Sequence, residues 1–323
     1  MPATRRQFLR GQLALTALAG SARARAAHAL RSRHGLAFGT RIAVTVAGLP
    51  DAQADAALDA AFAAIHEAES AAGLHQRGAA LWRLNQSGAL AWDDAQARGL
   101  RAMLAQALHW AEATEGAFDP TIQPLWQAHF AAMAAGQPLD AAALARLRAT
   151  TGWRGVRIDA QGVRLAREGM RLTLNGLSQG FAADRAWEAL AALGVRTALV
   201  DAGEWRAAGP AWRIGLRPGA PGLADIALQD AAVASSGIDG FRFSADGRLY
   251  HILDPRTGLS PPELAAAHVV APDACTADAL STACMVLGHA RALALVESLP
   301  GVHACLIDRA GRAWTSARWG SFG

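Results

Sequence analysis

The sequence predicts a mixed α+β protein that folds as a single unit of two lobes. Helix-periodic segments dominate the first half of the 323 residues, and short segments with β-type alternation dominate the second half. No repeat, low-complexity linker or composition shift separates the two halves. The hydrophobic content of 52% is sufficient for a sizeable core. We therefore expect a single mixed unit with two lobes.

The first 26 residues have the pattern of an export signal. The run "TRRQFL" carries a twin arginine, a short apolar stretch follows, and Ala24-Arg25-Ala26 fits signal cleavage. The apolar stretch at 11–20 is too short to span a bilayer. We expect a twin-arginine signal at 1–26, a mature unit at 27–323 without a transmembrane segment, and a periplasmic location.

Charge and cysteine content exclude several classes of function. The formal net charge is +4, but residues 1–26 hold five arginines and no acid, so +4 less 5 leaves −1 for the mature chain. The chain has no lysine and its body has no basic run, which argues against a nucleic-acid partner. The three cysteines lack CxxC spacing, which predicts buried free thiols rather than a zinc site or disulfide framework.

The first half reads as one strand followed by helices. Alternating Ile42, Val44 and Val46 predict a half-buried strand, and apolar residues at helical spacing predict a helix from Asp51 to about Ala72. The run "LHQRGAALWRLNQSG" is interpreted as a loop. Two further helices are predicted, one capped by Asp93 or Asp94 and stopping at Gly116, and a short one capped by Asp140.

The second half alternates strands with two helices. The run "GVRIDAQGVRLAREGMRLTL" predicts strands joined by tight turns. The turn "NGLSQG" precedes a helix from about Gln179 to Leu193, a stop at Gly194 and the strand "TALVDAG". Strands are then predicted at "WRIGLR", "LADIAL", "AAVASSG", "GRLYHILD" and "AAHVVA". A helix at 273–288 and two short strands around "HACLIDRAGRAWTS" complete the chain.

The helix at 273–288 gathers three oxygen-bearing side chains on one face. Asp278, Ser281 and Thr282 stand at i, i+3 and i+4 of an otherwise small and apolar helix. One interpretation is structural, with Asp278 complementing the helix dipole in the first turn and the hydroxyls bonding back to carbonyls. The other is a Mg²⁺ site, because a carboxylate and a hydroxyl are ligands that this hard cation accepts.

Three other motifs allow a ligand or a purely structural interpretation. The glycine turn "NGLSQG" before a helix can receive phosphate, or it can be only a turn. Asp119 in "EGAFDPTIQPLW" contacts a ligand or caps its own turn. In "YHILDPRTG", His251 and Asp254 are predicted at the end of a strand. His251 has either a catalytic or a structural role, and the simplest role for Asp254 is a hydrogen bond to its own turn.

Taken together and in order, these motifs resemble those of the ApbE family, the FAD:protein FMN transferases. The resemblance runs from about Phe38 to Gly288, and its "LNGLSQGFAADR" form is most similar to exported accessory members associated with nitrous-oxide respiration. It implies an ApbE-like fold with a T-fold-like core. The segments that carry it are "FGT", "LWRLN", "EGAFDPTIQPLW", "LNGLSQGFAADRA", "LVDAGEWRAAG", "VASSG", "YHILDPRTG" and "DACTADALSTACMVLG".

The resemblance implies a phosphoryl-group transfer. Members bind FAD with Mg²⁺, pass the FMN half to a threonine or serine hydroxyl of an exported target flavoprotein, and release AMP. Two alternatives stay open at this point. One is a Mg²⁺-dependent FAD pyrophosphatase that uses water as the acceptor, and the other is a non-enzymatic periplasmic flavin carrier.

The resemblance also implies the residues of the site. The metal contacts would be the Gly176 carbonyl, Asp278 and Thr282, with Ser281 standing where some members have a second Asp. Either Asp278 or His251 would accept the proton of the acceptor hydroxyl. Thr173 and Gln179 also depart from the family pattern, which commonly has Asp and Lys or Glu there. The FAD contacts would be Phe38, Ala117, Phe118, Asp119, Gln179 and Ile252, with His251 beside them.

Overall fold

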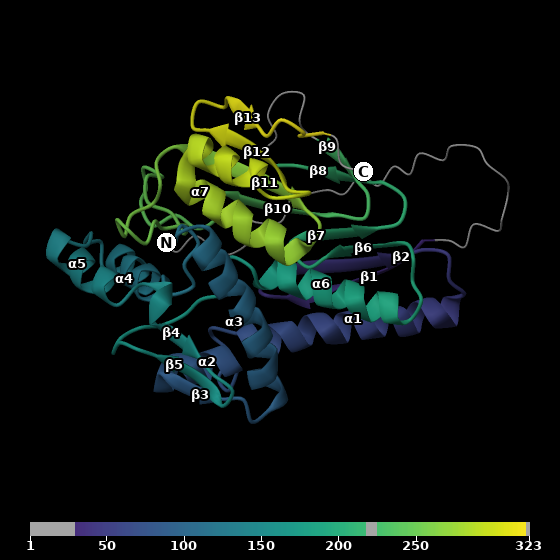
Figure 1. Ribbon diagram of the computed structural model, residues 1–323, viewed down its shortest axis with the longest axis horizontal. Coiled ribbons are helices and arrows are strands. Elements are labelled where there is room, and N and C mark those ends of the chain that lie inside the picture. The colour runs from purple at the N-terminus through teal and green to yellow at the C-terminus, as the bar shows by residue number, and fades with distance from the viewer. Residues whose placement is uncertain (1–29, 218–224, 321–323) are drawn as a thin grey trace.

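The computed structural model describes residues 30–217 and 225–320 and shows one large antiparallel sheet with helices packed against it (Figure 1). The predicted signal segment at 1–26 lies outside the described residues. The eight strands of the main sheet follow the order β1-β2-β6-β7-β10-β11-β12-β13. Their bounds are Arg31–Ala37, Thr40–Val46, Ala198–Asp201, Trp205–Ala208, Ala232–Gly237, Leu264–Ala271, His303–Asp308 and Ala313–Thr315.

Three long helices cover one face of this sheet, as Figure 1 shows. α1 (Asp51–Ala72) packs along α6 (Ser178–Ala192), and α6 packs along α7 (Ala274–Glu297). The core between these helices and the sheet is continuous and apolar, which stabilises both layers through burial. A separate hairpin of β8 (Trp212–Gly215) and β9 (Asp225–Leu228) packs with Leu199, Val233 and other residues of a second apolar cluster.

The remaining elements form a smaller lobe beneath and to the left of these helices in Figure 1. This lobe joins the larger one through α3 (Ala95–Ala113), which contacts both α1 and α7 and buries Leu100, Met103 and Leu104 in the same core cluster. Leu125 instead packs with Phe243 and Leu253 in a separate cluster. The predicted α+β unit of two lobes is therefore confirmed. The lobe consists of α2 (Ala80–Ser87), α3 (Ala95–Ala113), α4 (Gln123–Ala134), α5 (Ala141–Ala149), the 3-10 turn Trp153–Gly155, and a small sheet of β3 (Ala89–Ala91), β5 (Gly162–Leu165) and β4 (Val156–Ile158).

Locally encoded helices agree closely with the sequence prediction. α1 has the predicted bounds, and α3 and α5 begin after Asp94 and Asp140, whose carboxylates accept the N–H of Ala97 and Ala143. These caps satisfy backbone donors that an uncapped helix would leave without a partner. The three cysteines are free and buried, as predicted.

The first predicted strand is instead a hairpin of two strands. Phe38 and Gly39 form a two-residue connection between β1 and β2, and both adopt positive φ (52° and 73°). Two positive φ values match the twist of a tight hairpin. A bulky residue in this conformation is unusual, so Phe38 gives no turn signal in the sequence. For that reason only the strand around Ile42 was predicted, and the strand before the turn was missed.

Two helices arise where the sequence indicated loops or turns. α2 lies within "LHQRGAALWRLNQSG" and buries Leu81 and Leu84 completely, so tertiary packing stabilises a short helix of eight residues. α4 follows the "DP" turn, with Pro124 in its first turn, where a proline is tolerated. The loop interpretation of 74–88 therefore holds for 74–79 and is wrong for 80–87.

The segment "GRLYHILD" is not a strand, contrary to the prediction. It makes only an isolated bridge between Arg242 and Tyr250, whose backbone N–H instead donates to Ser260 Oγ. The Tyr250 side chain is buried and its hydroxyl donates to the Pro261 carbonyl. His251 and Asp254 therefore lie in a loop rather than at a strand end. The run 171–174, also read as extended strand, forms no ladder either.

The helix that carries the three oxygen-bearing side chains begins at Ala274, and Asp273 caps it by accepting the Thr276 N–H. Asp278 therefore lies in the second turn, and its predicted first-turn position is wrong. In the part of the chain that the structure describes, α7 is the one helix long and apolar enough to cross a membrane. Its packing against α6, β10 and β11 accounts for that apolar character.

Candidate functional site

A cavity of about 420 Å³ opens where α7, β10 and the segment between α3 and α4 meet. This volume lies within the range of roughly 300–1,000 Å³ that is usual for small-molecule sites. Its walls come from eight stretches that are separated in the sequence. The lining includes Leu74, His75, Ala117–Gln123 except Thr121, Trp126, Thr173, Asn175, Gly176, Gln179, Glu204, Arg217, Ser235–Gly237, Asp239, Gly240, His251–Leu253, Pro255, Asp278, Thr282 and Val286.

Asp278 presents a buried carboxylate at the cavity wall. The residue is only 4% exposed, and its Oδ2 accepts the Gly180 N–H at 3.0 Å. Burial raises the pKa of Asp278 to about 7, although the Gly180 hydrogen bond opposes this shift. Gly180 permits the contact because α6 and α7 nearly touch there: an added Cβ would lie 2.1 Å from the Ala274 carbonyl oxygen.

Glu204 is a second buried carboxylate in the same cavity, and sequence reasoning missed it. It immediately precedes β7 and is 9% exposed, and its Oε2 accepts the Ser235 N–H at 3.0 Å. Burial first and the Asp278 charge second hold the pKa of Glu204 well above its ordinary value. Within the described residues, neither carboxylate forms an ion pair with an arginine or histidine. Burial thus disfavours the charged forms of both carboxyls, and a bound cation would stabilise them as anions.

The hydroxyls of α7 are held by a short hydrogen-bonded chain. Ser281 Oγ donates to the Asp278 carbonyl at 2.9 Å, one of the two roles expected from the sequence. Because that bond uses the Ser281 proton, the 2.7 Å contact with Ser236 is a bond that Ser236 Oγ donates. Ser281 is fully buried and does not line the cavity, whereas Thr282 does and lies 3.3 Å from Ser236 Oγ.

Gly176 brings its backbone against the same wall. An added Cβ at Gly176 would lie 3.1 Å from Thr282 Oγ1 and 3.1 Å from the Phe118 ring. The glycine turn before α6 therefore approaches α7 more closely than a larger residue would allow without a shift. The predicted metal contacts Gly176, Asp278 and Thr282 are thus brought together, and Ser281 lies behind them.

The donor set fits a hard divalent cation. Carboxylate, hydroxyl and backbone carbonyl oxygens are the ligands that Mg²⁺ accepts, with phosphate oxygens and water completing the shell. No group of three or more His, Cys, Asp or Glu side chains suited to a metal occurs among residues 30–217 and 225–320. A zinc-type cage is therefore not formed there, and the oxygen set requires substrate oxygens to complete it.

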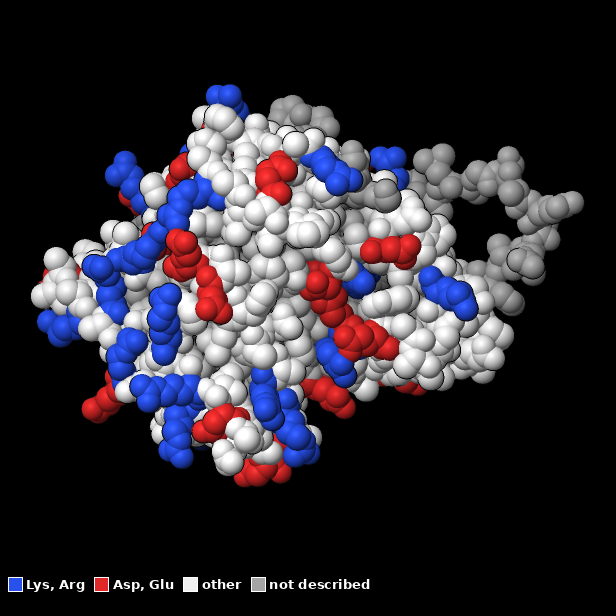
Figure 2. Space-filling view, in the orientation of Figure 1, with Lys and Arg blue, Asp and Glu red and all other residues white. Residues whose placement is uncertain are grey.

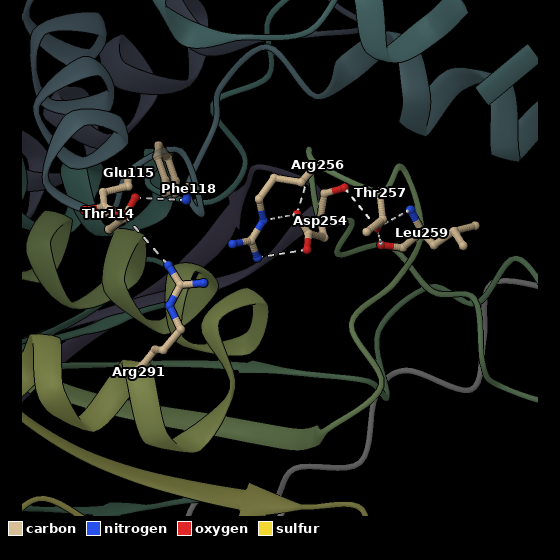
Figure 3. Close-up of polar contacts among 8 residues, drawn as sticks. All are labelled: Thr114, Glu115, Phe118, Asp254, Arg256, Thr257, Leu259 and Arg291. Atoms are coloured by element: carbon tan, nitrogen blue, oxygen red, sulfur yellow. Dashed lines mark hydrogen bonds and ion pairs between the residues drawn. The ribbon is translucent and has the colours of Figure 1, made fainter. Parts of the chain in front are cut away.

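Asp119 lines the cavity from a tightly bonded turn. Its Oδ1 accepts both the N–H and the hydroxyl of Thr121, at 2.8 and 2.6 Å, and its Oδ2 accepts the Trp153 N–H. Burial nevertheless raises the pKa of Asp119. The turn-capping role that the sequence allowed is therefore present. The neighbouring Phe118 N–H donates to Thr114 Oγ1 at 3.0 Å, which fixes the start of this segment (Figure 3).

His251 enters the cavity from the loop that follows β10. Its Nδ1 is buried and makes no hydrogen bond to any described residue, and burial lowers its pKa, so the imidazole is neutral near pH 7. Gly240 packs on the ring, since an added Cβ there would lie 2.3 Å from Cε1. The adjacent Ile252 also lines the cavity, as does Gln179, which packs against Gly203.

Phe38 does not line the cavity. Its ring is half-buried against the core, and its N–H donates to Glu69 Oε1 of α1 at 2.7 Å. The other predicted ligand contacts, Ala117, Phe118, Asp119, Gln179 and Ile252, do line it. FAD contact by any of these residues stays a prediction.

The comparison with known protein families supplies the identity of the fold. A family model described as the ApbE family matches residues 38–307 of this chain, which is more than half of its length. The chain belongs to the ApbE family. The nitrous-oxide subgroup that the sequence indicated stays a prediction, because the matches do not resolve it.

Relatives in the ApbE family carry a common activity name. A FAD:protein FMN transferase of Treponema pallidum (strain Nichols) is 32% identical over 314 residues, covering 88% of this chain and 86% of the relative. A FAD:protein FMN transferase of Haemophilus influenzae (strain ATCC 51907 / DSM 11121 / KW20 / Rd) is 31% identical over 215 residues, 60% of this chain and 62% of the relative.

Solved ApbE structures have the same fold. The apo form of the Pseudomonas stutzeri flavinyl transferase ApbE superposes with a TM-score of 0.80 at 25% identity, covering 93% of this chain and 98% of that one. The ApbE protein from Thermotoga maritima also gives a TM-score of 0.80 at 25% identity, covering 91% and 99%. The expected ApbE-like architecture is confirmed.

Several site residues of this ApbE protein were not identified from its sequence. Glu204 stood inside the motif "LVDAGEWRAAG", but a single acid before a strand gives no signal that it is buried. Ser236 stood likewise inside "VASSG". Trp126 ends "EGAFDPTIQPLW", and its approach to the cavity depends on the helix α4 that the sequence did not predict.

Proposed function

We propose that this chain transfers the FMN moiety of FAD to a threonine or serine hydroxyl of an exported flavoprotein, with Mg²⁺ as cofactor and AMP as the second product. Its membership of the ApbE family and the shared activity name of its relatives support the transferase reaction. The observation that carries the finer proposal is the pair of buried carboxylates beside Thr282 and the Gly176 turn.

In this proposal Asp278, Thr282 and the Gly176 carbonyl hold the metal ion, and Glu204 adds negative charge beside it. When bound, Mg²⁺ neutralises the diphosphate oxygens and the charge that develops as the bridge is cleaved. The Gly180 N–H and the Ser281 and Ser236 hydroxyls fix the α7 wall before substrate arrives. Such preorganisation lowers the barrier because little has to rearrange during the reaction.

His251 is assigned the proton-accepting role. The oxygen of the acceptor hydroxyl attacks the FMN-side phosphorus, the bond from that phosphorus to the bridging oxygen breaks, and AMP leaves with the bond electrons. The hydroxyl proton passes to the neutral imidazole of His251, which burial keeps unprotonated near pH 7. Asp278 is committed to the cation, so it is the less suitable base.

We further propose that the reaction takes place in the periplasm. The support is the twin-arginine pattern at 1–26, which belongs to a part of the chain outside the described residues. A fusion of residues 1–26 to a reporter that is active only after export tests this. Export that persists after Arg5 and Arg6 are both changed to lysine would contradict the twin-arginine assignment.

The activity test incubates the 27–323 chain with FAD and MgCl₂, with and without a candidate acceptor flavoprotein that carries an accessible threonine. Flavin that stays on the acceptor after denaturation, with one AMP per flavin, is the expected result. AMP and free FMN released equally with and without acceptor would make the protein a pyrophosphatase. FAD that binds but stays intact would make it a carrier.

A further inference from the structure

Four aromatic side chains form a cluster beside the cavity, here called the aromatic patch. Trp126 and Phe130 of α4 stack with ring centroids 5.5 Å apart. Phe241 and Phe243, from the loop after β10, lie 6.0 and 5.4 Å from the Trp126 ring. Phe130 and Phe241 also contact each other at 5.7 Å. The patch therefore joins two segments that are far apart in the sequence.

This part of the surface exposes an unusual amount of apolar area. The described residues leave seven large hydrophobic side chains exposed, and three of them lie in the patch or on the α4 face that carries it. Phe130 is 43% exposed, Phe241 40% and Met133 36%. Trp126, Phe130 and Met133 follow one another at i, i+4 and i+7, so they share one face of α4. Contiguous exposed apolar surface of this kind commonly marks an interaction site.

The patch is continuous with the cavity. Trp126 belongs to the patch and also lines the cavity. Asp239, Gly240 and Pro255, from the loop that carries Phe241 and Phe243, line the cavity as well. A hydrogen bond of 2.7 Å from His129 Nε2 to the Gly258 carbonyl fastens this loop to α4. Within the loop, Asp254 accepts the backbone N–H and guanidinium of Arg256, and Leu259 donates to Thr257 Oγ1 (Figure 3). The surface next to the reaction site is thus preformed.

The charge around the patch is positive. The acids of the loop are paired internally, since Asp239 pairs with Arg242 and Asp254 with Arg256. Arg148 at the end of α5 approaches Gly258, and Arg171 donates to Gln127 of α4. Neither forms an ion pair with an acid among the described residues. Figure 2 shows blue side chains gathered over the region where Figure 1 places α4 and α5.

We propose that the aromatic patch is the docking site for the polypeptide that receives FMN. The occupant would be a segment of the acceptor protein with an apolar side chain near its reactive hydroxyl and acidic residues facing Arg148 and Arg171. This inference rests on the proposed function, because a protein acceptor must place its hydroxyl in a cavity whose rim includes Trp126. Apolar contact at the rim and complementary charge around it match the usual anatomy of a protein interface.

The test uses the 27–323 chain with FAD, MgCl₂ and two short synthetic peptides that carry a central threonine. One peptide has leucine and aspartate beside the threonine, and the other has glycine and lysine at the same positions. Phe130→Ser, Phe241→Ser and Arg148→Glu alter the patch or its charge. Leu193→Ser is the matched control, because Leu193 is 55% exposed and follows α6, outside the patch.

The wild-type enzyme is expected to label the leucine-aspartate peptide in preference to the other, with FMN-peptide measured by mass spectrometry. Each patch variant should raise KM for that peptide by roughly tenfold, as loss of an interface anchor does. The affinity for FAD, read from flavin fluorescence, should stay unchanged in every variant. Thermal melting verifies that each variant is folded.

Several results would overturn the inference. The docking site alone would be rejected if the patch variants behave like Leu193→Ser. It would also be rejected if the wild-type enzyme releases AMP but neither binds nor labels the leucine-aspartate peptide preferentially. A parallel loss of FAD affinity would assign the patch to the FAD site. Dissociation of a dimer by Phe241→Ser, seen in sedimentation, would make the patch a contact between two copies. No AMP and no labelled acceptor under any condition would instead reject the proposed function.

Discussion

Replacing Gly180 with alanine should separate α6 from α7 and disturb the candidate metal site. The Cβ of alanine would lie 2.1 Å from the Ala274 carbonyl oxygen and 2.8 Å from Asp278 Cβ. Both distances are far below ordinary van der Waals contact, and the nearer atom belongs to the backbone, which cannot rotate away. The two helices must therefore move apart at the point where Asp278 accepts the Gly180 N–H.

The cost follows from three contributions. Overpacking in a dense interior costs about 1–3 kcal/mol. Loss or stretching of a hydrogen bond to a carboxylate costs about 1.5–3 kcal/mol more when that carboxylate is charged. Alanine favours the helix over glycine by up to about 1 kcal/mol, which offsets part of this. The free energy of unfolding should fall by about 1.5–6 kcal/mol, or roughly 2–10 °C in Tm for a chain of this size.

The assay is urea unfolding followed by circular dichroism, together with calorimetric titration of Mg²⁺ into the folded variant. Gly99→Ala is the matched control, because it is also a glycine in a helix, but its added Cβ would meet only the Ala71 Cβ at 3.5 Å. Gly99→Ala should be neutral or stabilising by up to about 1 kcal/mol. Equal unfolding free energies for the two variants would refute the argument from close helix contact.

Three further predictions concern single side chains. Asp278→Asn keeps the shape and the bond from Gly180 but removes the charge, so Mg²⁺ affinity in calorimetry should fall at least about tenfold without loss of stability; unchanged affinity would remove Asp278 from the metal site. His251→Ala should lower kcat by roughly 10²–10⁴-fold with FAD affinity retained, and in the wild type the acidic limb of kcat should lie at lower pH than for an ordinary histidine, since burial lowers its pKa; a proportional loss of FAD affinity would indicate a binding role. Burial raises the pKa of Asp201 to about 6 from 3.8, so its neutral form stabilises the fold below pH 4 and this contribution is lost as pH rises to about 6. Relative to Asp201→Asn, the wild type should therefore lose about 1–3 kcal/mol of unfolding free energy between pH 4 and 7; parallel stability curves would contradict this.

The sequence predicted the elements whose signals are local. The bounds of α1 and the starts of α3 and α5 follow from apolar periodicity and from aspartate caps, which act within a few residues of themselves. The two-residue turn at Phe38 and Gly39 was not predicted, because a phenylalanine with positive φ gives no turn signal. The helix α2 was missed for a related reason: its stability comes from burial of Leu81 and Leu84 rather than from its own caps.

The candidate site divides in the same way. Spacing along one helix was enough to place Asp278 and Thr282 on a common face, and the ordered motifs placed the Gly176 turn beside them. Only the tertiary structure decided that Ser281 lies behind the wall, that His251 reaches the cavity from a loop, and that Glu204 lies beside Asp278.

By itself, then, the sequence determined the ApbE family, the fold class and the helix that carries the site. The tertiary structure decided which carboxylates are buried together and what borders the cavity. The physical reason is that helix periodicity and caps depend on neighbours within one or two turns. Glu204 instead meets Ser235 because β7 pairs with β10, and it meets Asp278 because α7 packs on that part of the sheet. Burial of a charge is a property of that assembled layer, and no short run of residues encodes it.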